Sequence, residues 1–323
     1  MHRRTFTLAA AGAALAGCLP SAFAQTWPDR PVKLILAHPA GSGVDNVARV
    51  VADRVSRGWG QQVVIENKPG GQNLIGAQYA ARSPADGYNF YFATSAALVT
   101  NVFLFKALPY DPQKDFVPVG LIGRSPFAVL VEDKSPLRSI ADLLARARAQ
   151  PGRVSIAIEG PKTFGGMIAR VFNAQAKVET NLVSYASVAV AIQDTLGGHT
   201  DVLVADVAST AQLVRQGRLR MLAVTTGKRL VDFDTVLTLA ETLPGFEMSG
   251  WMAVVAPTGT PREAVQRFAR DLDAALLDKD TAERIRGLGP VPEAGGAEYL
   301  AAFLLAERVR WEQLTKEIGL LPE

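Results

Sequence analysis

The feature that most constrains the fold is a regular alternation of short apolar runs with segments of helical periodicity. Residues 32–37 read VKLILA, a run typical of a buried strand, and residues 45–57 then place four valines at the spacing of one helix face. Strand-like runs return at 62–66, 90–93, 127–131, 154–158, 201–205, 219–225 and 251–256, and helical segments at 74–81, 139–148, 164–173, 261–277 and 298–318. This alternation predicts the α/β class, with helices layered on parallel sheets.

The first 24 residues have the features of a secretory signal peptide. Arg3 and Arg4 give a basic start, and residues 6–16 form an apolar run that is too short to span a bilayer. The triplet Ala-Phe-Ala at 22–24 offers a cleavage site before Gln25. We therefore expect an exported, periplasmic protein whose mature chain begins at Gln25.

Two questions about export stay open at this point. The stretch RRTFTL at 3–8 resembles a twin-arginine signal, and the alternative is an ordinary secretory signal that happens to hold two arginines. The stretch LAGC at 15–18 resembles a lipobox, which would lipidate Cys18 and anchor the chain to a membrane. Cys18 is the sole cysteine of the sequence, so neither alternative allows a disulfide framework.

Composition excludes several classes of protein. The 34 Lys and Arg nearly balance the 31 Asp and Glu, and no basic stripe with interleaved aromatics appears, so nucleic acid is not an expected partner. A chain of roughly 300 mature residues is long enough for two domains. The three histidines, His2, His38 and His199, lie far apart, so we predict no metal site and no cofactor.

A glycine-containing turn between the first strand and the first helix is the best local candidate for a binding site. A turn such as PAGSG at 39–43 presents backbone N–H groups and the positive end of the helix dipole, which suits a small carboxylate. A purely structural turn is one alternative. A dinucleotide site is another, because 41–46 resembles G-x-G-x-x-G with Asn46 in place of the third glycine, and Glu66 follows about 20 residues later.

The same construction returns after a later strand, at residues 158–164. Two such loops would face each other across a cleft, at the carboxyl ends of the strands. His38 ends the first strand and is interpreted as a pocket-lining residue, a packing residue or a general base. No G-x-S-x-G elbow and no suitably spaced pair of carboxylates accompanies it, so we do not expect an enzyme.

Ordered blocks along the whole mature chain resemble one known family. They read WPDRPV at 27–32, PAGSGVD at 39–45, GQQVVIENKPG at 60–70, NLIGA at 73–77, PADGY at 84–88, LPYDP at 108–112, GRLR at 217–220, LAVT at 222–225, PGFE at 244–247 and APTGTP at 256–261. The sequence is similar to the tripartite tricarboxylate transporter receptors, also called Bug-type extracytoplasmic solute-binding proteins.

The resemblance implies an architecture and a role. The fold would be of the periplasmic-binding-protein type II-like class, with two α/β domains around a central ligand cleft and two crossover strands. By analogy the first domain comprises residues 26–125 and 252–323, and the second comprises 126–251. Such proteins capture small organic acids for an inner-membrane transporter or a sensor kinase, without chemistry, and we expect a monomer.

The resemblance also implies binding residues. The first carboxylate loop corresponds to Ala40, Gly41, Ser42, Gly43, Val44 and Asp45, and a second turn corresponds to Thr94, Ser95 and Ala96. Tyr185 matches a cleft aromatic, Asp206 falls where relatives place Asn or Asp, and His38 stands where many carry an aromatic. The second loop supplies Glu159, Gly160, Thr163 and Phe164.

The second loop departs from the family pattern. Gly166 and Ala186 replace a His and a Lys of the family, while Glu159 adds a carboxylate that would repel a bound dianion unless it is paired or protonated. The predicted ligand is therefore a monocarboxylate, an amino acid or an aromatic acid rather than a tricarboxylate. Two further hypotheses are an interaction or sensor protein that no longer binds a small ligand, and an exported enzyme that uses His38.

Overall fold

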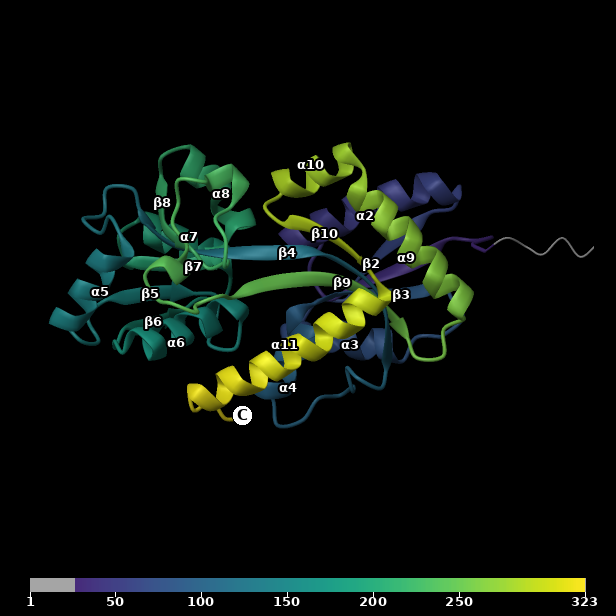
Figure 1. Cartoon of the computed structure of the whole chain (residues 1–323), viewed down its shortest axis with the longest axis horizontal. Coiled ribbons are helices and arrows are strands. Elements are labelled where there is room, and N and C mark those ends of the chain that lie inside the picture. Colours follow the sequence, from purple (N-terminus) through teal and green to yellow (C-terminus); the bar gives the residue numbers. More distant parts are fainter. Residues whose placement is uncertain (1–26, 323) are drawn as a thin grey trace, which may run out of the picture.

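A computed structural model describes residues 27–322, and the predicted signal peptide with Cys18 lies outside the described residues. The chain forms two α/β lobes that lie side by side along the long axis and are joined by two long strands (Figure 1). The predicted α/β class, with two lobes and two crossover strands, is confirmed.

The elements include every segment that the sequence predicts, together with further helices and strands at 101–104, 181–184, 188–196, 207–215, 279–287 and 291–296 that it did not predict. The strands are β1 (Val32–Leu36), β2 (Val63–Asn67), β3 (Asn89–Thr94), β4 (Phe116–Glu132), β5 (Ser155–Ile158), β6 (Asn181–Ser184), β7 (Val202–Asp206), β8 (Leu219–Val224), β9 (Ser249–Pro257) and β10 (Val291–Gly296). The helices are α2 (Gly43–Trp59), α3 (Leu74–Ala81), α4 (Asn101–Leu104), α5 (Ile140–Ala149), α6 (Phe164–Ala176), α7 (Val188–Leu196), α8 (Val207–Arg215), α9 (Arg262–Leu277), α10 (Lys279–Gly287) and α11 (Ala297–Glu317). A π-helical turn, η2 (Ala96–Thr100), and the short 3-10 turns η1 (Gly71–Asn73), η3 (Val231–Phe233) and η4 (Leu239–Glu241) complete the set.

The strands form a mixed sheet rather than the purely parallel sheets expected from the sequence. Its order is β2-β1-β3-β9-β4-β7-β5-β6, with β8 and β10 also paired to β4. Parallel pairing holds within each lobe, between β1, β2 and β3 and between β5, β6 and β7. The strands β4 and β9 run antiparallel to their neighbours, because they carry the chain from one lobe to the other and back.

The strand β4 serves both lobes in succession. Its residues 116–126 pair with β9, and its residues 127–132 pair with β7 and β8. The chain therefore passes between the lobes at the pairs Ser125–Gly250 and Pro126–Ser249. The domain limits 26–125 with 252–323, and 126–251, stay a prediction.

The helix α2 shows how local sequence fixes an element at the cleft. The Ser42 side chain caps its first turn by accepting from the Asp45 N–H, and Gly60 ends it in the left-handed conformation. The valines that predicted the helix face, together with Ala48, are buried against the sheet. Burial of this stripe stabilises the helix, and the cap sets where it begins.

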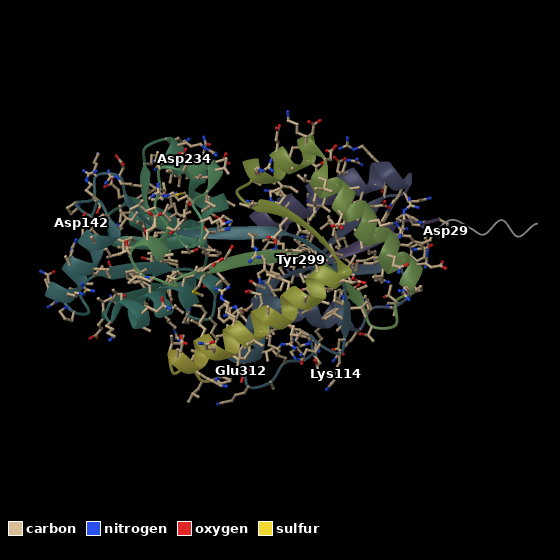
Figure 2. The ribbon with its side chains drawn as sticks, in the orientation of Figure 1. Asp29, Lys114, Asp142, Asp234, Tyr299 and Glu312 are labelled. Carbon is tan, nitrogen blue, oxygen red and sulfur yellow. The ribbon has the colours of Figure 1, made fainter. Side chains whose placement is uncertain are left out.

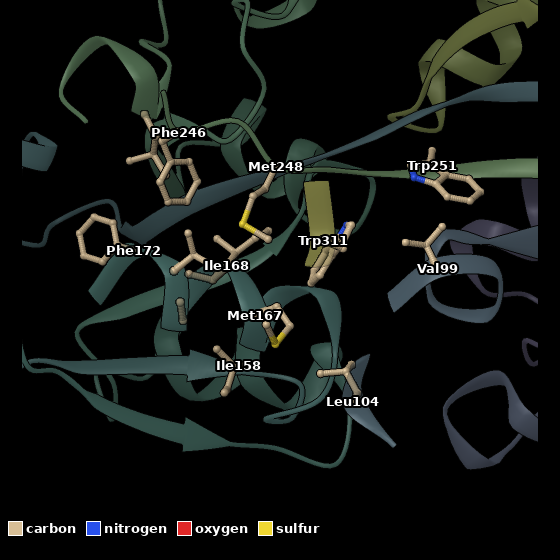
Figure 3. Close-up of a cluster of buried hydrophobic side chains, with 14 of the residues drawn as sticks. Val99, Leu104, Ile158, Met167, Ile168, Phe172, Phe246, Met248, Trp251 and Trp311 are labelled. Carbon is tan, nitrogen blue, oxygen red and sulfur yellow. The ribbon is translucent and has the colours of Figure 1, made fainter. Parts of the chain in front are cut away.

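One hydrophobic core continues from one lobe into the other. It includes Ile35 and Tyr91 of the first lobe, Ile158 and Met167 of the second, and Trp311 of α11. Figure 3 shows Trp311 between Met248 and Met167, close to Ile168. Trp311 is only 2% exposed, and its ring centroid lies 5.7 Å from that of Phe164. The terminal helix thus packs on both lobes.

Many charged side chains lie at the periphery of the molecule (Figure 2). Asp29 and Asp142 lie near opposite ends of the long axis, and Glu312 lies on the outer side of α11 (Figure 2). Among residues 27–322 no helix combines the length and the apolar character that crossing a bilayer requires.

Candidate functional site

A cavity of about 610 Å³ lies between the two lobes. Its lining comes from the carboxyl ends of strands in both lobes, from the helix starts that follow them, and from the crossing strands. The residues are Ala37, His38, Ser42, Gly43, Val44, Gly70, Gln72, Asn73, Thr94, Ser95, Ala96, Asn101, Ser125, Phe127, Glu159, Gly160, Lys162, Thr163, Phe164, Gly165, Ala186, Val188, Asp206, Ala208, Ser209, Gly250, Trp251, Met252 and Pro290. Strand ends of this kind are where open α/β sheets bind ligands.

Asp45 fixes the conformation of the first loop through the hydrogen bonds of its carboxylate. Its side chain is fully buried and accepts hydrogen bonds from the Gly41 N–H (2.8 Å), from Arg49 (2.8 and 3.1 Å) and from the Asn67 amide (2.9 Å). Burial acts to raise the pKa of Asp45, but the bonds from Arg49, Asn67 and Gly41 outweigh it and hold the pKa below its ordinary value. The carboxylate therefore shapes the loop and is not among the cavity-lining groups.

The first turn of α2 is open towards the cavity. The first amides of a helix have no partner inside the helix, and the Ser42 cap satisfies that of Asp45. Gly43 and Val44, which supply the first two helical amides, both line the cavity. Together with the helix dipole, these amides favour an anion at this position.

The second loop presents the start of α6 in the same way. The Thr163 hydroxyl accepts from the Gly166 N–H (3.2 Å) and donates to the Gly160 carbonyl (2.8 Å), which closes the turn tightly. A Cβ atom at Gly166 would lie 2.1 Å from the Gly160 oxygen. Only glycine fits there, which gives a physical reason for its presence where the resembling family has a histidine.

Two carboxylates stand on the second-lobe wall. The strands β5 and β7 are parallel neighbours, and Glu159 and Asp206 lie at their carboxyl ends. Both oxygens of Asp206 accept from Ser209, at 2.8 to 2.9 Å. Burial raises the pKa of Asp206, against the hydrogen bonds from Ser209 that lower it. Burial and the charge of Asp206 both raise the pKa of Glu159.

His38 lines the cavity on the first-lobe side, just after the end of β1. Its Nδ1 is buried without a hydrogen-bond partner in the described part of the chain. Burial lowers its pKa to about 4, although the charge of Asp45 acts in the opposite direction. The imidazole is therefore neutral near pH 7, which suits a pocket wall and gives no support to an acid–base role.

The structure gathers most of the predicted site residues around this cavity. The lining includes His38, Ser42, Gly43, Val44, Thr94, Ser95, Ala96, Glu159, Gly160, Thr163, Phe164 and Asp206. Ala40, Gly41, Asp45 and Tyr185 are not part of the lining. Asp45 is turned inward, and the Tyr185 hydroxyl donates to Asp194 (2.7 Å). That these lining residues bind a ligand stays a prediction.

Several lining residues escaped the sequence analysis. Gln72 and Asn73 have positive φ values of 53° and 73° in the turn before α3, and Asn101 donates to the Gln72 carbonyl. Ser125 and Gly250 face each other on the crossing strands. The pair GG at 70–71 signalled the turn, but no local pattern showed that β4 and β9 pass beneath the cleft.

Metal binding finds no support in the geometry. Among residues 27–322 no group of three or more His, Cys, Asp or Glu is arranged to hold an ion. Glu66, which would have bound a ribose in the dinucleotide hypothesis, is instead bonded to Tyr79 and paired with Lys33 and Lys68. The cavity therefore offers helix amides together with the carboxylates of Glu159 and Asp206.

Solved structures with this fold include the periplasmic binding protein BugD, which is 29% identical over 92% of this chain and all of that one, with a TM-score of 0.82. The chain is 33% identical to Rpa4515 of R. palustris, solved with adipate, over 92% of this chain and all of that one, with a TM-score of 0.85. It is 25% identical to MatC of Rhodopseudomonas palustris with bound malate, over 89% of this chain and 99% of that one, with a TM-score of 0.79.

Comparison of amino-acid sequences also finds relatives that match nearly the whole chain. A curated relative, the UPF0065 protein in the tcbD-tcbE intergenic region of Pseudomonas sp. strain P51, is 35% identical over 96% of this chain and 94% of its own length. The sequence model described as tripartite tricarboxylate transporter family receptor matches residues 47–320. The resemblance seen in the sequence is confirmed: the chain belongs to the tripartite tricarboxylate transporter receptor family.

Proposed function

We propose that the protein captures a small carboxylate in the cavity between its lobes and presents it to a membrane transporter of the tripartite tricarboxylate type. The observation that carries the proposal is the convergence of two helix starts, those of α2 and α6, on one cavity. The adipate and malate of the two solved relatives support a carboxylate as the ligand class. The periplasmic relatives support a location outside the cytoplasmic membrane.

Capture would proceed by closure of the two lobes about the crossing strands. The backbone amides of Gly43 and Val44 would bind the carboxylate from one side, and those at the start of α6 from the other. Ordered water would fill the remaining space and bridge to hydroxyl groups such as that of Thr94.

The test is binding of mono-, di- and amino-carboxylates of two to eight carbons to ligand-free protein, against amides and alcohols that lack the carboxylate. A ligand at 100 times its Kd should raise the free energy of unfolding by about 2.7 kcal/mol. The proposal fails if no carboxylate of the panel shifts thermal unfolding or gives heat in calorimetry.

A backbone substitution tests the site directly. Gly43→Pro removes the first helical N–H, and proline suits this position because Ser42 before it is extended (φ −68°, ψ 162°). A lost hydrogen bond to a charged group is worth about 1.5–3 kcal/mol, so carboxylate affinity should fall at least tenfold.

The matched control is Lys279→Pro at the first position of α10. Asp278 before it is also extended (φ −66°, ψ 125°), and Lys279 is exposed and absent from the cavity lining. This variant should bind as the parent does. Equal loss of affinity in both variants would show a general effect of proline and contradict the assigned site.

A further inference from the structure

The wall of the cavity that belongs to the second lobe carries two carboxylates, which disfavour a second carboxylate of the ligand at this wall. Glu159 and Asp206 end neighbouring parallel strands, and the charge of Asp206 acts on Glu159. The two carboxylates therefore lie close enough to repel each other, and a second ligand carboxylate placed there would add to that repulsion.

The two carboxylates differ in their hydrogen-bond partners within the protein. Asp206 caps α8, and its oxygens accept from the backbone and hydroxyl of Ser209. Glu159 lines the cavity and is exposed to the solvent that fills it, and within residues 27–322 its carboxylate takes part in no hydrogen bond or ion pair. A carboxylate that lines a cavity and lacks a protein partner is suited to bind a group of the ligand.

The other side chains of the lining do not change this conclusion. His38 is neutral near pH 7, so it does not offset the two negative charges. Lys162 lines the cavity with its ammonium 4.9 Å from the centre of the Phe105 ring. The charge that shifts the pKa of Glu159 is that of Asp206.

We propose that Glu159, supported by Asp206, binds an ammonium group of the ligand, so that the protein selects amino acids, including ω-amino acids, over dicarboxylates. The inference rests on the proposed function, because the helix starts of α2 and α6 still bind the ligand carboxylate. An ammonium group placed beside both carboxylates would remove their mutual repulsion and complete the hydrogen bonding of Glu159. The ligands of the two solved relatives, adipate and malate, are dicarboxylates without an ammonium group.

The test compares ligands of equal length that differ at one end. For chains of three to six carbons, the ω-amino acid, the dicarboxylate and the monocarboxylate are titrated by calorimetry at pH 7.5, together with the α-amino acids. The best ammonium-bearing ligand should bind at least tenfold more tightly than the dicarboxylate of the same length. A dicarboxylate that binds equally well or better would overturn the inference and leave carboxylate capture intact.

The variant Glu159→Gln assigns the preference to one side chain. It keeps the shape of the residue and removes a repulsive charge, so it should fold with at least the parent stability. We expect the ratio of affinities for ammonium ligand over dicarboxylate to fall at least fivefold. An unchanged ratio would overturn the role of Glu159.

The matched control is Glu179→Gln, which removes the same charge from an exposed position of the same lobe outside the cavity. It should leave the ratio unchanged, and an equal fall in both variants would overturn the local assignment. If no carboxylate of any class binds the parent protein, the proposed function itself fails, and this result is distinct from binding without preference.

Discussion

His38 shows how burial sets the protonation state of a single side chain in the cavity wall. Its Nδ1 is buried, and its pKa lies at about 4 in the folded protein, against about 6.5 in an unfolded chain. The unfolded state therefore binds a proton between these two values while the folded state does not. Linkage requires that stability is lost as pH falls from about 6.5 to about 4.

We predict that His38→Phe removes this part of the pH dependence. The stability advantage of the parent over the variant should shrink by about 2 kcal/mol between pH 7.5 and pH 4.5, measured by urea unfolding. His199 is exposed on a turn, so His199→Gln serves as the control and should run parallel to the parent. Parallel curves for His38→Phe would show that the imidazole titrates as it does in water.

The sequence predicted which residues lie at the site better than it predicted the structural role of each residue. Most of the residues predicted from the glycine-containing turns, the strand ends and the family resemblance line the cavity, but they make up less than half of its lining. The task of Asp45 could not be seen, since it depends on Asn67 and on the inward turn of its side chain. The proximity of Glu159 and Asp206 follows from the pairing of β5 with β7, which no local pattern specifies.

At the scale of elements, the start of α6 depends on close approach between two turns of backbone. A Cβ atom at Gly166 would meet the Gly160 oxygen, so Gly166→Ala must displace the loop that carries Glu159. We predict a loss of about 2 kcal/mol in the free energy of unfolding and at least a tenfold loss of ligand affinity. Chemical denaturation and calorimetry measure the two effects.

The control for this substitution is Gly58→Ala in α2. A Cβ atom there meets nothing within 4 Å, so alanine should stabilise the helix by about 0.5–1 kcal/mol and leave binding unchanged. Gly166→Ala with parent-like affinity would contradict the role assigned to this loop.

Elements with continuous periodicity were predictable, and interrupted ones were not. The helix predicted at 74–81 matches α3, and the one predicted at 139–148 matches α5, whose first turn is capped by Ser139. For β4 the sequence analysis found only residues 127–131, because Pro118, Gly120 and Gly123 interrupt the first part, where the strand is irregular. Long-range pairing with β9 and β10 makes that part a strand.

At the scale of the whole molecule, the lobes touch across the cleft at the start of α8. A Cβ atom at Gly289 of the first lobe would lie 2.5 Å from the Ala208 Cα atom, and one at Gly43 would lie 3.8 Å from the Ala208 Cβ atom. A residue larger than glycine at position 289 would therefore collide with the start of α8, whereas the distance at Gly43 is ordinary van der Waals contact. The two lobes meet here beside the capped starts of α2 and α8.

We predict that Ala208→Leu holds the lobes apart. Ligand affinity should fall at least tenfold, and the ligand-bound protein should have a larger radius of gyration in small-angle scattering than the bound parent. Ala141→Leu is the matched control, since Ala141 occupies the same second position of α5 but is exposed. Parent-like affinity of Ala208→Leu would show that binding does not require this contact.

The path of the two crossing strands also determines the order in which the chain can complete its structure. The strand β3 pairs with β9, which follows the whole of the second lobe in the sequence, and α11 then packs on both lobes. The second lobe is close to a continuous stretch, so it can form while the rest of the polypeptide is still being delivered. The sheet of the first lobe cannot be completed until the last quarter of the chain is available, and until then β3 has an exposed edge. Such non-local pairing slows folding and exposes the unfinished sheet to aggregation. An N-terminal fragment that ends before β9 should therefore be a target for chaperones or proteases.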